Sequence, residues 1–413
     1  MKIAIDPWTL AARFRFQGTY VYAQNLIAEF KRLVQTEAAG SNVDFCLFAP
    51  PADKADAVAN DSSAIAPQTH FDVRPEALLA NDALWRIAGL GRAARRAHAD
   101  LIFAPTASSM PFSGVPMVCT IHDVTPIVMP SHGTRSTMIL RSAMWTLAKF
   151  SRAIITDSEC SKRDIVRTYG IPVEKVSVIY LGYNKSVFNT TPPAADERQK
   201  VLNKIGVTKP YILHHGTIQP RKNLERLIAA YRLMLARTPD ADFDLVLPGR
   251  LGWDYQRILE AAKNESAKDA AANGHRSGNR SSENRSSDGR GRVLFPGTLS
   301  DEDLSIVIKG ASLVVIPSLY EGFCLPMVES MACGTPTVVS GTSCLPEVSG
   351  NALAYFDPVA VESIADTMAK ALYDSALSNQ ISEQGLARAA VFSWQRCAAE
   401  TLNVLVREGN RRK

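Results

Sequence analysis

The sequence predicts an α/β protein of two domains, each with a parallel β-sheet that helices cover on both faces. The chain has 413 residues, which suits two or three domains of about 150 residues. Short β-rich runs alternate with segments of helical periodicity, as in βαβ units. Most runs are continuously apolar, which is typical of strands buried on both faces. Twelve such runs are many for one sheet, so we expect two sheets.

The expected elements follow one another regularly along the chain. In the first domain the strands are Lys2–Asp6, Asp44–Ala49, Leu101–Ala104, Met117–His122, Ala153–Thr156 and Val176–Tyr180. In the second they are Tyr211–His215, Phe243–Leu247, Val293–Pro296, Leu313–Pro317, Thr337–Ser340 and Leu353–Phe356. Helical periodicity is clearest in Thr19–Val34, Thr134–Lys149 and Leu224–Leu235. Phe392–Arg407 reads as a long amphipathic helix with Ser393 as its candidate N-cap.

The domain boundary is expected in a stretch without strand pattern that contains two consecutive prolines, Pro192 and Pro193. The expected parts are a first domain over 1–183, a linker over 184–209, a second domain over 210–385 and a C-terminal segment over 386–413. Residues 260–292 contain no large apolar side chain, so burial cannot offset the entropy of ordering them. We expect a disordered surface insertion there; the alternative is a basic tether for an anionic partner or a membrane surface.

Composition excludes several classes of protein. Hydrophobic residues make up 46% and charged residues 21%, as in soluble globular proteins. No apolar run is long enough for a transmembrane helix, and the first residues lack the pattern of a signal peptide. A net charge of +5 is too small for a dedicated nucleic-acid binder. Seven scattered cysteines without a CxxC pair indicate reduced thiols in a cytoplasm, not disulfides or a zinc site.

The most informative motif runs from Glu321 to Glu329 and contains Gly-Phe-Cys-Leu-Pro. It follows an expected strand and opens a helix, with Pro326 suited to the first turn. Unsatisfied amides and the helix dipole at such an N-terminus favour a phosphate. The two carboxylates flank that position, so one could hold a sugar and the other a ribose. The alternative is that Glu321 is a dipole partner and Glu329 an ordinary surface acid.

A second motif, His214-His-Gly-Thr-Ile-Gln-Pro-Arg-Lys-Asn-Leu, also links a strand to a helix. Gly216 permits close backbone approach. Arg221 suits bidentate contact with a phosphate and Lys222 a point contact. Two cations at a helix start are mildly unfavourable against the dipole, which favours a functional role over a solvated surface.

The first domain offers weaker signals. Gly18 lies between the first strand and the first helix, where it could approach a ligand or simply form a turn. His122 and Asp123 end a buried strand, at the edge of the sheet where ligands bind in open α/β folds. His122 could contact a substrate hydroxyl, while Asp123 could fix its tautomer or pair with a neighbouring group. The alternative is a structural histidine at a strand end.

Several other motifs are absent from the sequence or have ordinary explanations. No P-loop pattern and no Gly-x-Gly-x-x-Gly after a strand occurs, and no His, Cys and Asp cluster has metal-ligand spacing. The segment Trp85–Ala99 has four arginines and no acid. It could lie on an anionic membrane, but a solvated basic helix that packs by its Ala and Leu side is the favoured interpretation.

Together these residues resemble the retaining GT-B glycosyltransferases of family 4 (group 1), especially bacterial mannosyltransferases that build polysaccharides. The resemblance covers nearly the whole chain. Glu321–Glu329 matches the family's Glu-x7-Glu motif, and Gly216–Asn223 matches its phosphate-binding turn. Pro296–Leu304 matches the turn that borders the nucleotide base, and His122 matches the histidine near the donor sugar.

The resemblance implies a GT-B fold: two Rossmann-like, doubly wound domains that face each other across a cleft, with the last helix returning to the first domain. It implies that Arg221 and Lys222 bind the diphosphate, that Glu321 contacts the donor sugar and Glu329 the ribose, and that His122 lies near the reacting centre. The donor is further expected to lie against Gly18, Gly216, Leu299, Gly322, Phe323, Cys324 and Leu325.

This chain departs from the family pattern at two places. Many members have Gly-Arg where this chain has Gly216 and Thr217, so its phosphate site has one cation fewer. Many also have a Gly-Gly or Gly-Ile-Gly loop where this chain has Phe16-Gln-Gly18, which affects the acceptor side.

The function expected from the resemblance is hexosyl transfer with retention of configuration. The expected donor is GDP-mannose and the acceptor a glycan or polyprenyl-linked glycan in bacterial polysaccharide synthesis. No metal and no cofactor beyond the sugar nucleotide are expected, nor any nucleic-acid partner. The location would be the cytoplasm, with peripheral contact to the inner membrane left open. The alternatives are a UDP- or dTDP-sugar-dependent glycosyltransferase, a sugar-nucleotide epimerase and a non-catalytic sugar-nucleotide binder.

Overall fold

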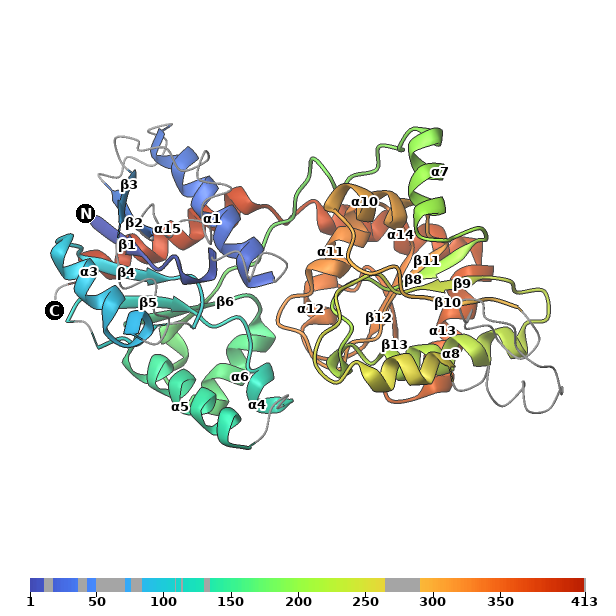
Figure 1. Cartoon of the computed structure of the whole chain (residues 1–413), viewed down its shortest axis with the longest axis horizontal. Helices are drawn as coiled ribbons and strands as arrows, with labels where there is room; N and C mark the ends of the chain where they lie inside the picture. The colour runs from blue at the N-terminus through green and yellow to red at the C-terminus, as the bar shows by residue number, and fades with distance from the viewer. Residues whose placement is uncertain are drawn as a thin grey trace. The chain divides into compact units, whose positions relative to one another are not determined.

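The computed structural model describes residues 1–10, 18–35, 43–49, 71–75, 84–107, 109–112, 114–129, 134–263 and 290–411. Two compact units form within these ranges. The first consists of Met1–Gly182 together with Phe392–Lys413, and the second of Tyr183–Val391 (Figure 1). Each is a doubly wound α/β unit, which confirms the predicted fold class.

The first unit contains a seven-stranded parallel sheet in the order β3-β2-β1-β4-β5-β6-β7. Its strands are β1 Lys2–Ile5, β2 Asp44–Ala49, β3 Phe71–Pro75, β4 Leu101–Ala104, β5 Met117–Thr120, β6 Ala153–Thr156 and β7 Val176–Val178. Its helices are α1 Gly18–Gln35, α3 Leu90–Arg96, α4 Thr125–Val128, α5 Thr134–Phe150, α6 Glu159–Tyr169 and α15 Trp394–Asn410. The core is apolar and partly aromatic: the Phe30 ring of α1 stacks on Phe45 of β2, with centroids 5.0 Å apart.

The second unit contains a six-stranded parallel sheet in the order β10-β9-β8-β11-β12-β13. Its strands are β8 Tyr211–Leu213, β9 Asp244–Val246, β10 Val293–Leu294, β11 Leu313–Ile316, β12 Thr337–Ser340 and β13 Ala354–Phe356. Its helices are α7 Ala195–Lys204, α8 Leu224–Arg237, α10 Asp301–Gly310, α11 Leu325–Ala332, α12 Leu345–Ser349, α13 Val361–Tyr373 and α14 Ser375–Ala389. The central strands β8 and β11 are fully buried, as their continuous apolar sequences predict.

All twelve predicted strands are present, and the three clearest helices match α1, α5 and α8 within two residues at each end. Strand β3 was not predicted. Its sequence, Phe71-Asp-Val-Arg-Pro75, alternates apolar and polar residues and ends in proline. It forms the edge of the sheet, where such a sequence is tolerated.

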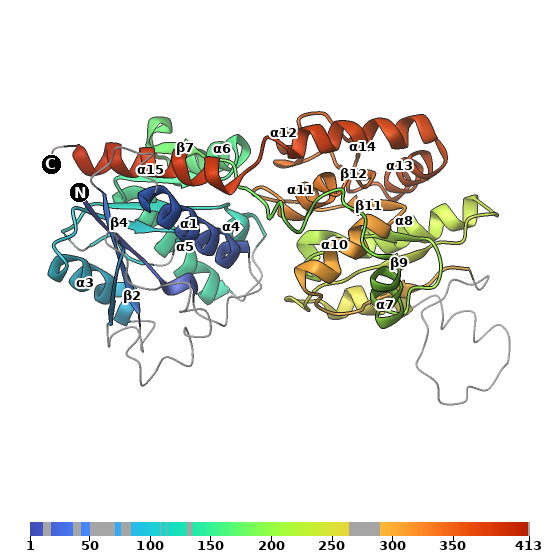
Figure 2. The same cartoon turned by 90° about the horizontal axis from the view of Figure 1, so that it is seen from above.

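The C-terminal helix α15 packs along α1 in the first unit, as Figures 1 and 2 both show. The Ser393 side chain accepts a hydrogen bond from the Arg396 amide, which confirms the predicted N-cap. Gln395 Nε2 of α15 donates to Glu29 Oε1 of α1 at 2.6 Å. The chain enters the first unit again at Phe392, six residues later than expected from the sequence.

The expected linker differs from the structure, and so do the two ends of the expected insertion. Residues 184–209 belong to the second unit and contain α7, which packs on α10 and is tied to it by the Lys204–Asp303 ion pair. Of the segment 260–292, residues 264–289 lie outside the described residues. Its two ends are ordered: Ala262 is buried, and Arg292 forms an ion pair with the buried Asp244 at 2.6 Å.

Candidate active site

The second unit has one position where its topology favours ligand binding. Strands β8 and β11 are neighbours at the centre of the sheet, and the connections that follow them lead to opposite sides. In open α/β sheets, ligands bind at the carboxyl ends of the strands at this switch point. The loop after β8 contains Gly216, Arg221 and Lys222, and the loop after β11 contains Glu321. The fold therefore brings the two predicted motifs together.

Glu321 forms ion pairs with both cations of the other loop. Lys222 Nζ donates to Glu321 Oε1 at 2.6 Å, and an Arg221 guanidinium nitrogen donates to Glu321 Oε2. Lys222 and Glu321 are each only 5% exposed. Charges buried this far are stable only when they are paired. The three side chains thus form a single buried cluster with one net positive charge, which suits a site for an anion.

The pKa of Glu321 depends on its burial and on the charges of the two cations. Burial alone would raise it, but the charges of Arg221 and Lys222 outweigh burial and lower the pKa to about 2. Glu321 is therefore ionised throughout the physiological range. Because its carboxylate already accepts from two cations, it is a poor proton donor and is held in one orientation.

Asn223 anchors the loop that carries the two cations. Its backbone is left-handed, with a φ of 59°, a conformation that asparagine tolerates better than most residues. Its side-chain amide donates to Pro317 O at 3.1 Å and to Pro358 O at 2.7 Å. The Leu319 amide also donates to Arg221 O at 3.0 Å. These bonds tie the loop after β8 to the loop after β11, so the cations and Glu321 keep a fixed geometry.

Glycines allow the loops after neighbouring strands to approach one another. The Gly216 amide donates to Pro248 O at 3.1 Å, and the Gly249 amide donates to Gly297 O at 2.8 Å. A Cβ on Gly249 would lie 1.8 Å from Gly216 O, and its φ of 155° is also unsuited to other residues. A Cβ on Gly216 would lie 3.9 Å from Lys222 Nζ and from Pro326 Cγ. The backbone at Gly216 therefore borders the space between the lysine and the next helix.

Helix α11 begins beside this space. Cys324 precedes it with a left-handed backbone, a φ of 75°, and no side chain caps the helix. The Met327 and Val328 amides both bond to Cys324 O, and Pro326 has no amide hydrogen. The Leu325 amide, at the first helical position, has no acceptor within the helix. The helix N-terminus therefore has the free amide that the predicted anion site requires, and Gly216 lies between Pro326 of this helix and Lys222.

Glu329 lies just over one turn into α11, and its carboxylate lies near the ring of His215. His215 Nδ1 lies 3.8 Å from Glu329 Oε2, while its Nε2 donates to Ser330 Oγ, which itself donates to Pro326 O. Burial lowers the pKa of His215 to about 3, so it is neutral. Burial, and next the charge of Asp301, raise the pKa of Glu329 to about 8. Glu329 thus holds a proton at neutral pH in the ligand-free enzyme.

Asp301 also locates the turn expected beside the nucleotide base. It is the first residue of α10, which Ser300 caps by accepting from the Asp303 amide at 3.1 Å. Since Asp301 acts electrostatically on Glu329, the turn over 296–300, including half-buried Leu299, lies at the same edge of the sheet.

His122 lies in the first unit, at the carboxyl end of β5. Its Nδ1 bonds to Asp157 Oδ2 at 2.7 Å, and the Tyr22 ring packs edge-on against it with centroids 4.8 Å apart. Burial alone would lower the pKa of His122, but Asp157 outweighs it and raises that pKa. Nε2 is buried and has no hydrogen-bond partner within the described part of the chain. Asp157 therefore orients the ring through Nδ1, and the Pro105 backbone also raises the pKa of His122.

Asp157 is the partner of His122, and Asp123 has the second of its two predicted roles, that of pairing with a neighbouring group. The Asp123 carboxylate accepts from the Thr125 amide at 2.8 Å, two residues on, at the start of the short helix α4. Asp157 follows β6, which is the neighbour of β5 in the sheet. Parallel pairing brings the carboxyl ends of both strands to one edge, so an acid just after the next strand was the signal that could have identified it.

Comparison with protein families identifies the chain. The model for glycosyl transferases group 1 matches residues 196–388, and the model for glycosyltransferase family 4 matches residues 18–187. The chain belongs to the group 1, family 4 glycosyltransferases. It is therefore an enzyme that moves a glycosyl group from a donor to an acceptor.

Two curated relatives of this glycosyltransferase come from Escherichia coli. O-antigen chain mannosyltransferase B is 28% identical over 288 residues, which cover 69% of each chain. The serotype-specific mannosyltransferase WbdA is 30% identical over 295 residues, 70% of this chain but 33% of WbdA. This chain thus spans about a third of the length of WbdA.

Solved structures show the same fold at low identity. HepE from Anabaena, crystallised with UDP and glucose, aligns with a TM-score of 0.67 and 20% identity over 98% of this chain and 100% of that chain. Sucrose-phosphate synthase from Thermosynechococcus elongatus aligns with a TM-score of 0.70 and 18% identity over 98% of each chain. These likenesses support the GT-B fold expected from the sequence.

Ser343 is a further residue of the glycosyltransferase site, and it was not predicted from the sequence. Its hydroxyl donates to Glu321 O at 2.7 Å and accepts from the Glu321 amide at 3.0 Å. It follows β12, and its backbone is left-handed with a φ of 59°. Because one hydroxyl bonds to both backbone groups of Glu321, Ser343 fixes the backbone of that residue, while the two cations fix its carboxylate.

The positions of three other predicted residues, Gly18, Gly322 and Phe323, say less about their predicted roles. Gly18 is the first residue of α1, and no atom lies within 4 Å of a Cβ built on it. The rest of its motif, residues 14–17, lies outside the described residues. Gly322 and Phe323 are buried in the loop between Glu321 and α11. Within the described ranges, no group of three His, Cys, Asp or Glu side chains could hold a metal ion.

Proposed function

We propose that this glycosyltransferase moves a hexose, mannose from GDP-mannose, onto a glycan or lipid-linked glycan acceptor in bacterial polysaccharide synthesis, with retention of configuration. The observation that carries the proposal is the buried cluster of Lys222, Arg221 and Glu321 at the switch point beside α11. The choice of mannose is supported by the two relatives named as mannosyltransferases. The proposal involves no cofactor, because the sugar nucleotide is itself the donor substrate.

In this proposal the diphosphate binds between Lys222, Arg221 and the N-terminus of α11. The phosphate oxygens take the amide hydrogen of Leu325 and share the two cations with Glu321. Charge accumulates on the leaving phosphate as the glycosidic bond breaks. Preorganised cations at that position stabilise the transition state more than the ground state, and stabilisation of this kind often contributes most to an enzyme's rate enhancement.

Two carboxylates have different proposed roles. Glu321, fixed by two cations and by Ser343, accepts hydrogen bonds from hydroxyls of the donor sugar. Glu329 faces the ribose, whose hydroxyls supply the hydrogen-bond donors that its carboxylate lacks in the ligand-free enzyme. Binding there favours the ionised form of Glu329, so its raised pKa should fall when the nucleotide binds.

The proposed transfer is a front-face displacement. The bond from the anomeric carbon to the diphosphate oxygen breaks, the acceptor oxygen bonds to the same face of that carbon, and the acceptor proton passes to the departing phosphate. A nucleophilic carboxylate is not required. Glu321 is ill suited to that role, because both of its oxygens already accept from cations. His122, held by Asp157, is proposed to contact the donor sugar through Nε2.

GDP is the proposed nucleotide. The base would lie against the turn over 296–304, where free backbone carbonyls would suit the N1–H and amino donors of guanine. A site built to hydrogen-bond one base rejects another strongly, because its polar groups are left unpaired. Uracil or thymine would leave part of such a site empty.

The test is turnover with a panel of GDP-mannose, UDP-glucose and dTDP-sugars, with mannose-containing oligosaccharides as acceptors. We expect release of GDP that depends on the acceptor, and a product whose anomeric proton shows retention by NMR. Turnover with a UDP-sugar alone would overturn the donor. Release of nucleotide without transfer, or binding without turnover, would overturn the activity.

We place the proposed reaction in the cytoplasm, at the inner face of the membrane where lipid-linked acceptors are found. No helix within the described ranges has the length and apolar character needed to cross a bilayer. Contact with the membrane would therefore be peripheral in this proposal.

A further inference from the structure

The first unit has an exposed apolar face on helices α4 and α5. Five large side chains form it: Phe112, Val128, Met138, Trp145 and Phe150. Each is between 46% and 67% exposed. Single exposed apolar residues are normal on protein surfaces, but a contiguous group indicates an interaction.

Ring contacts link three of these side chains, and the other two lie on α4 and α5. Met138 and Trp145 are seven residues apart on α5 and so share one face of the helix. The Trp145 and Phe150 rings lie 6.3 Å apart between centroids, and Phe150 lies 5.4 Å from Phe112. Val128 belongs to α4, which packs against α5. We call this group the α5 face.

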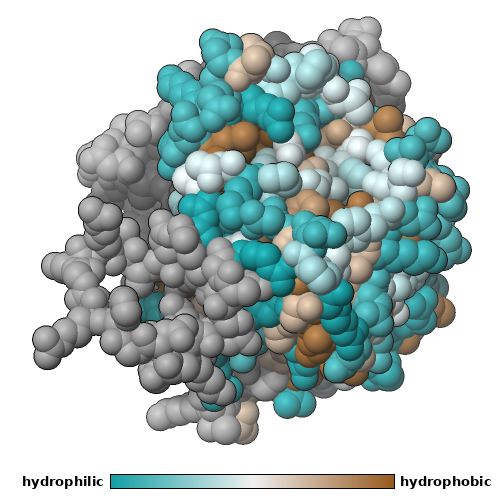
Figure 3. Space-filling view, turned by 90° about the vertical axis from the view of Figure 1, so that its right-hand side faces the viewer, coloured by the Kyte–Doolittle hydropathy of each residue, from teal (hydrophilic) through white to brown (hydrophobic). Residues whose placement is uncertain are grey.

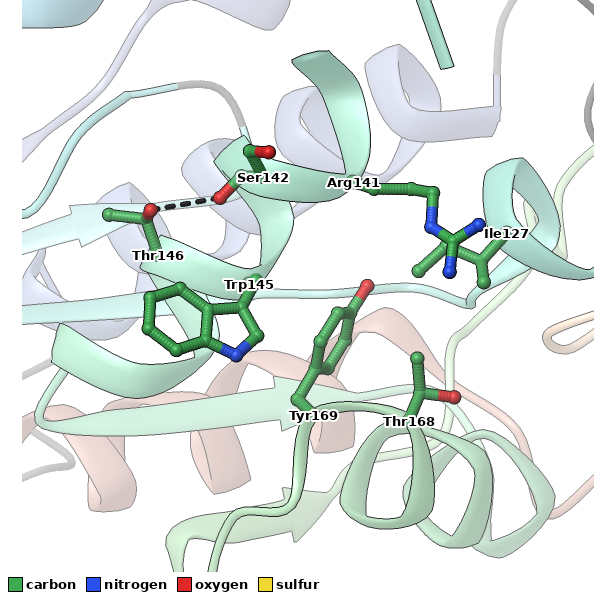
Figure 4. Close-up of a pocket in the computed structure, with 7 residues that line it drawn as sticks. All are labelled: Ile127, Arg141, Ser142, Trp145, Thr146, Thr168 and Tyr169. Atoms are coloured by element: carbon green, nitrogen blue, oxygen red, sulfur yellow. Dashed lines mark hydrogen bonds between the residues drawn. The ribbon is translucent and has the colours of Figure 1, made fainter. Parts of the chain in front are cut away.

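A hollow of about 450 Å³ opens beside the α5 face. Its lining includes Trp145 and Arg141 of α5 and Tyr169 at the end of α6. Figure 4 shows the indole on one side of the hollow, the guanidinium on the other and the phenol ring between them. The Tyr169 hydroxyl is buried and has no hydrogen-bond partner within the part of the chain that the structure describes. The hollow thus combines two aromatic rings with a cation.

The charge on helix α5 has one sign, while at the hollow burial, and next the Asp123 carboxylate, raise the pKa of Tyr169. Helix α5, Thr134–Phe150, contains no acidic residue, and it places Arg141 and Lys149 beside the apolar side chains. The Lys149 Nζ lies 6.0 Å from the Trp145 ring centroid and donates to Gly170 O at 2.8 Å. The stripe of Met138, Arg141, Trp145 and Lys149 therefore alternates apolar and basic side chains. Aromatic and basic residues on one helix face are typical of helices that lie in a membrane interface.

A second surface shares part of this composition, because Ile87 is 66% exposed and Leu84 53% exposed in a segment that also contains four arginines. The segment Trp85–Ala99, the candidate from the sequence, buries Trp85, Leu90, Ala93 and Ala94. This confirms the favoured interpretation of a basic helix that packs by its apolar side. In the second unit, the face seen in Figure 3 is mostly hydrophilic, with apolar residues scattered over it.

We propose that the α5 face binds the surface of an anionic phospholipid bilayer. The apolar side chains enter the interface, Arg141 and Lys149 pair with lipid phosphates, and the hollow beside Trp145 accommodates a headgroup. The proposal rests on the proposed function in one respect, since it supplies the peripheral contact expected for a lipid-linked acceptor. It names the surface and the partner, and it requires no particular donor.

The test is sedimentation of the full chain with vesicles made of equal parts phosphatidylglycerol and phosphatidylcholine. We expect binding to these vesicles, weak binding to phosphatidylcholine alone, and loss of most binding at high salt. The double variant Trp145→Ser with Phe150→Ser should weaken binding by about tenfold or more. Arg141→Gln should weaken it by about fivefold. All three side chains are exposed, so the fold should tolerate these changes.

Matched controls lie in the second unit. The double variant Val359→Ser with Tyr373→Ser removes two comparably exposed apolar side chains, at 61% and 53% exposure. Arg257→Gln removes an exposed cation from the same unit. Both controls should bind the anionic vesicles like the unmodified enzyme.

Two results would overturn the proposal. One is binding that is absent, or that the α5 variants leave unchanged. The other is concentration-dependent self-association that the α5 variants abolish without vesicle binding, which would make this face a dimer contact. Transfer to a water-soluble acceptor, measured in the same variants, should be unchanged. That assay separates failure of the membrane proposal from failure of the proposed function.

Discussion

Lys222 and Glu321 lie 99 positions apart in the sequence and form an ion pair of 2.6 Å, with both side chains buried. The pair joins the ends of the two central strands of the second sheet. Arg221 completes the cluster, so the ligand-free enzyme already contains an anion at the place where we propose a phosphate binds. Glu321 therefore keeps the two cations in position and also competes with the proposed phosphate for them.

Replacing Glu321 with glutamine should separate structure from catalysis. Glu321→Gln keeps the shape but leaves two cations without their carboxylate, so we expect the free energy of unfolding to fall by about 3 kcal/mol. Transfer should fall by about two orders of magnitude or more, because contact with the donor sugar is lost in the transition state. Thermal unfolding and initial rates measure the two effects. Near-normal turnover of the folded variant would remove Glu321 from the mechanism.

Replacing Asp157 should reduce turnover more than replacing Asp123. Asp157→Asn removes the charge that orients and raises the pKa of His122, so we expect about a tenfold or larger loss of turnover and a shifted pH–rate profile. Asp123→Asn is the comparison variant, since Asp123 bonds to the Thr125 amide and its charge raises the pKa of His122 less than Asp157 does. Equal effects of the two substitutions on the pH–rate profile would show that Asp157 does not act through His122.

Ser343 should act through Glu321. Ser343→Ala removes the hydroxyl that bonds to both backbone groups of Glu321, so turnover should fall about tenfold while affinity for free GDP changes little. Ser349→Ala serves as the control, because its hydroxyl bonds to Leu345 O within α12 and touches no proposed catalytic residue. A parallel loss of GDP affinity in Ser343→Ala would indicate general damage to the loop.

Glu329 should make stability depend on pH. Its folded-state pKa of about 8 lies above its ordinary value of 4.5, so the folded chain holds a proton that the unfolded chain lacks between these values. That contribution is complete below pH 4.5 and is lost as pH rises through 8, with a slope of at most about 1.4 kcal/mol per pH unit.

Urea unfolding of the unmodified chain and of Glu329→Gln at a series of pH values measures this effect. The difference in unfolding free energy between the two should shrink, or reverse in favour of Glu329→Gln, as pH rises toward 8. A difference that stays constant with pH would show that Glu329 is ionised in the folded enzyme.

Most of the fold could be predicted from the sequence, because continuous apolar runs are a direct consequence of burial on both faces. Strand β3 could not, since an edge strand needs only one buried face and Phe71–Pro75 carries an alternating pattern. The motifs at Gly216–Asn223 and Glu321–Glu329 were recognisable because each is local. Asp157 and Ser343 were missed because their roles arise from contacts between loops after neighbouring strands, for which a single sequence gives no direct signal.

The phosphate site is tested most directly by calorimetric titration of GDP into the unmodified enzyme, Lys222→Ala and Glu321→Gln. Lys222→Ala should weaken GDP binding by about tenfold or more, because a buried cation that faces the phosphate is lost. Glu321→Gln should strengthen it several-fold, because the internal anion no longer competes for both cations. Lys209→Ala, which removes a lysine that pairs with Asp242 just before the amino end of β8, should leave GDP affinity unchanged. GDP affinity that is the same in Lys222→Ala as in the unmodified enzyme would contradict the phosphate site and with it the proposed mechanism.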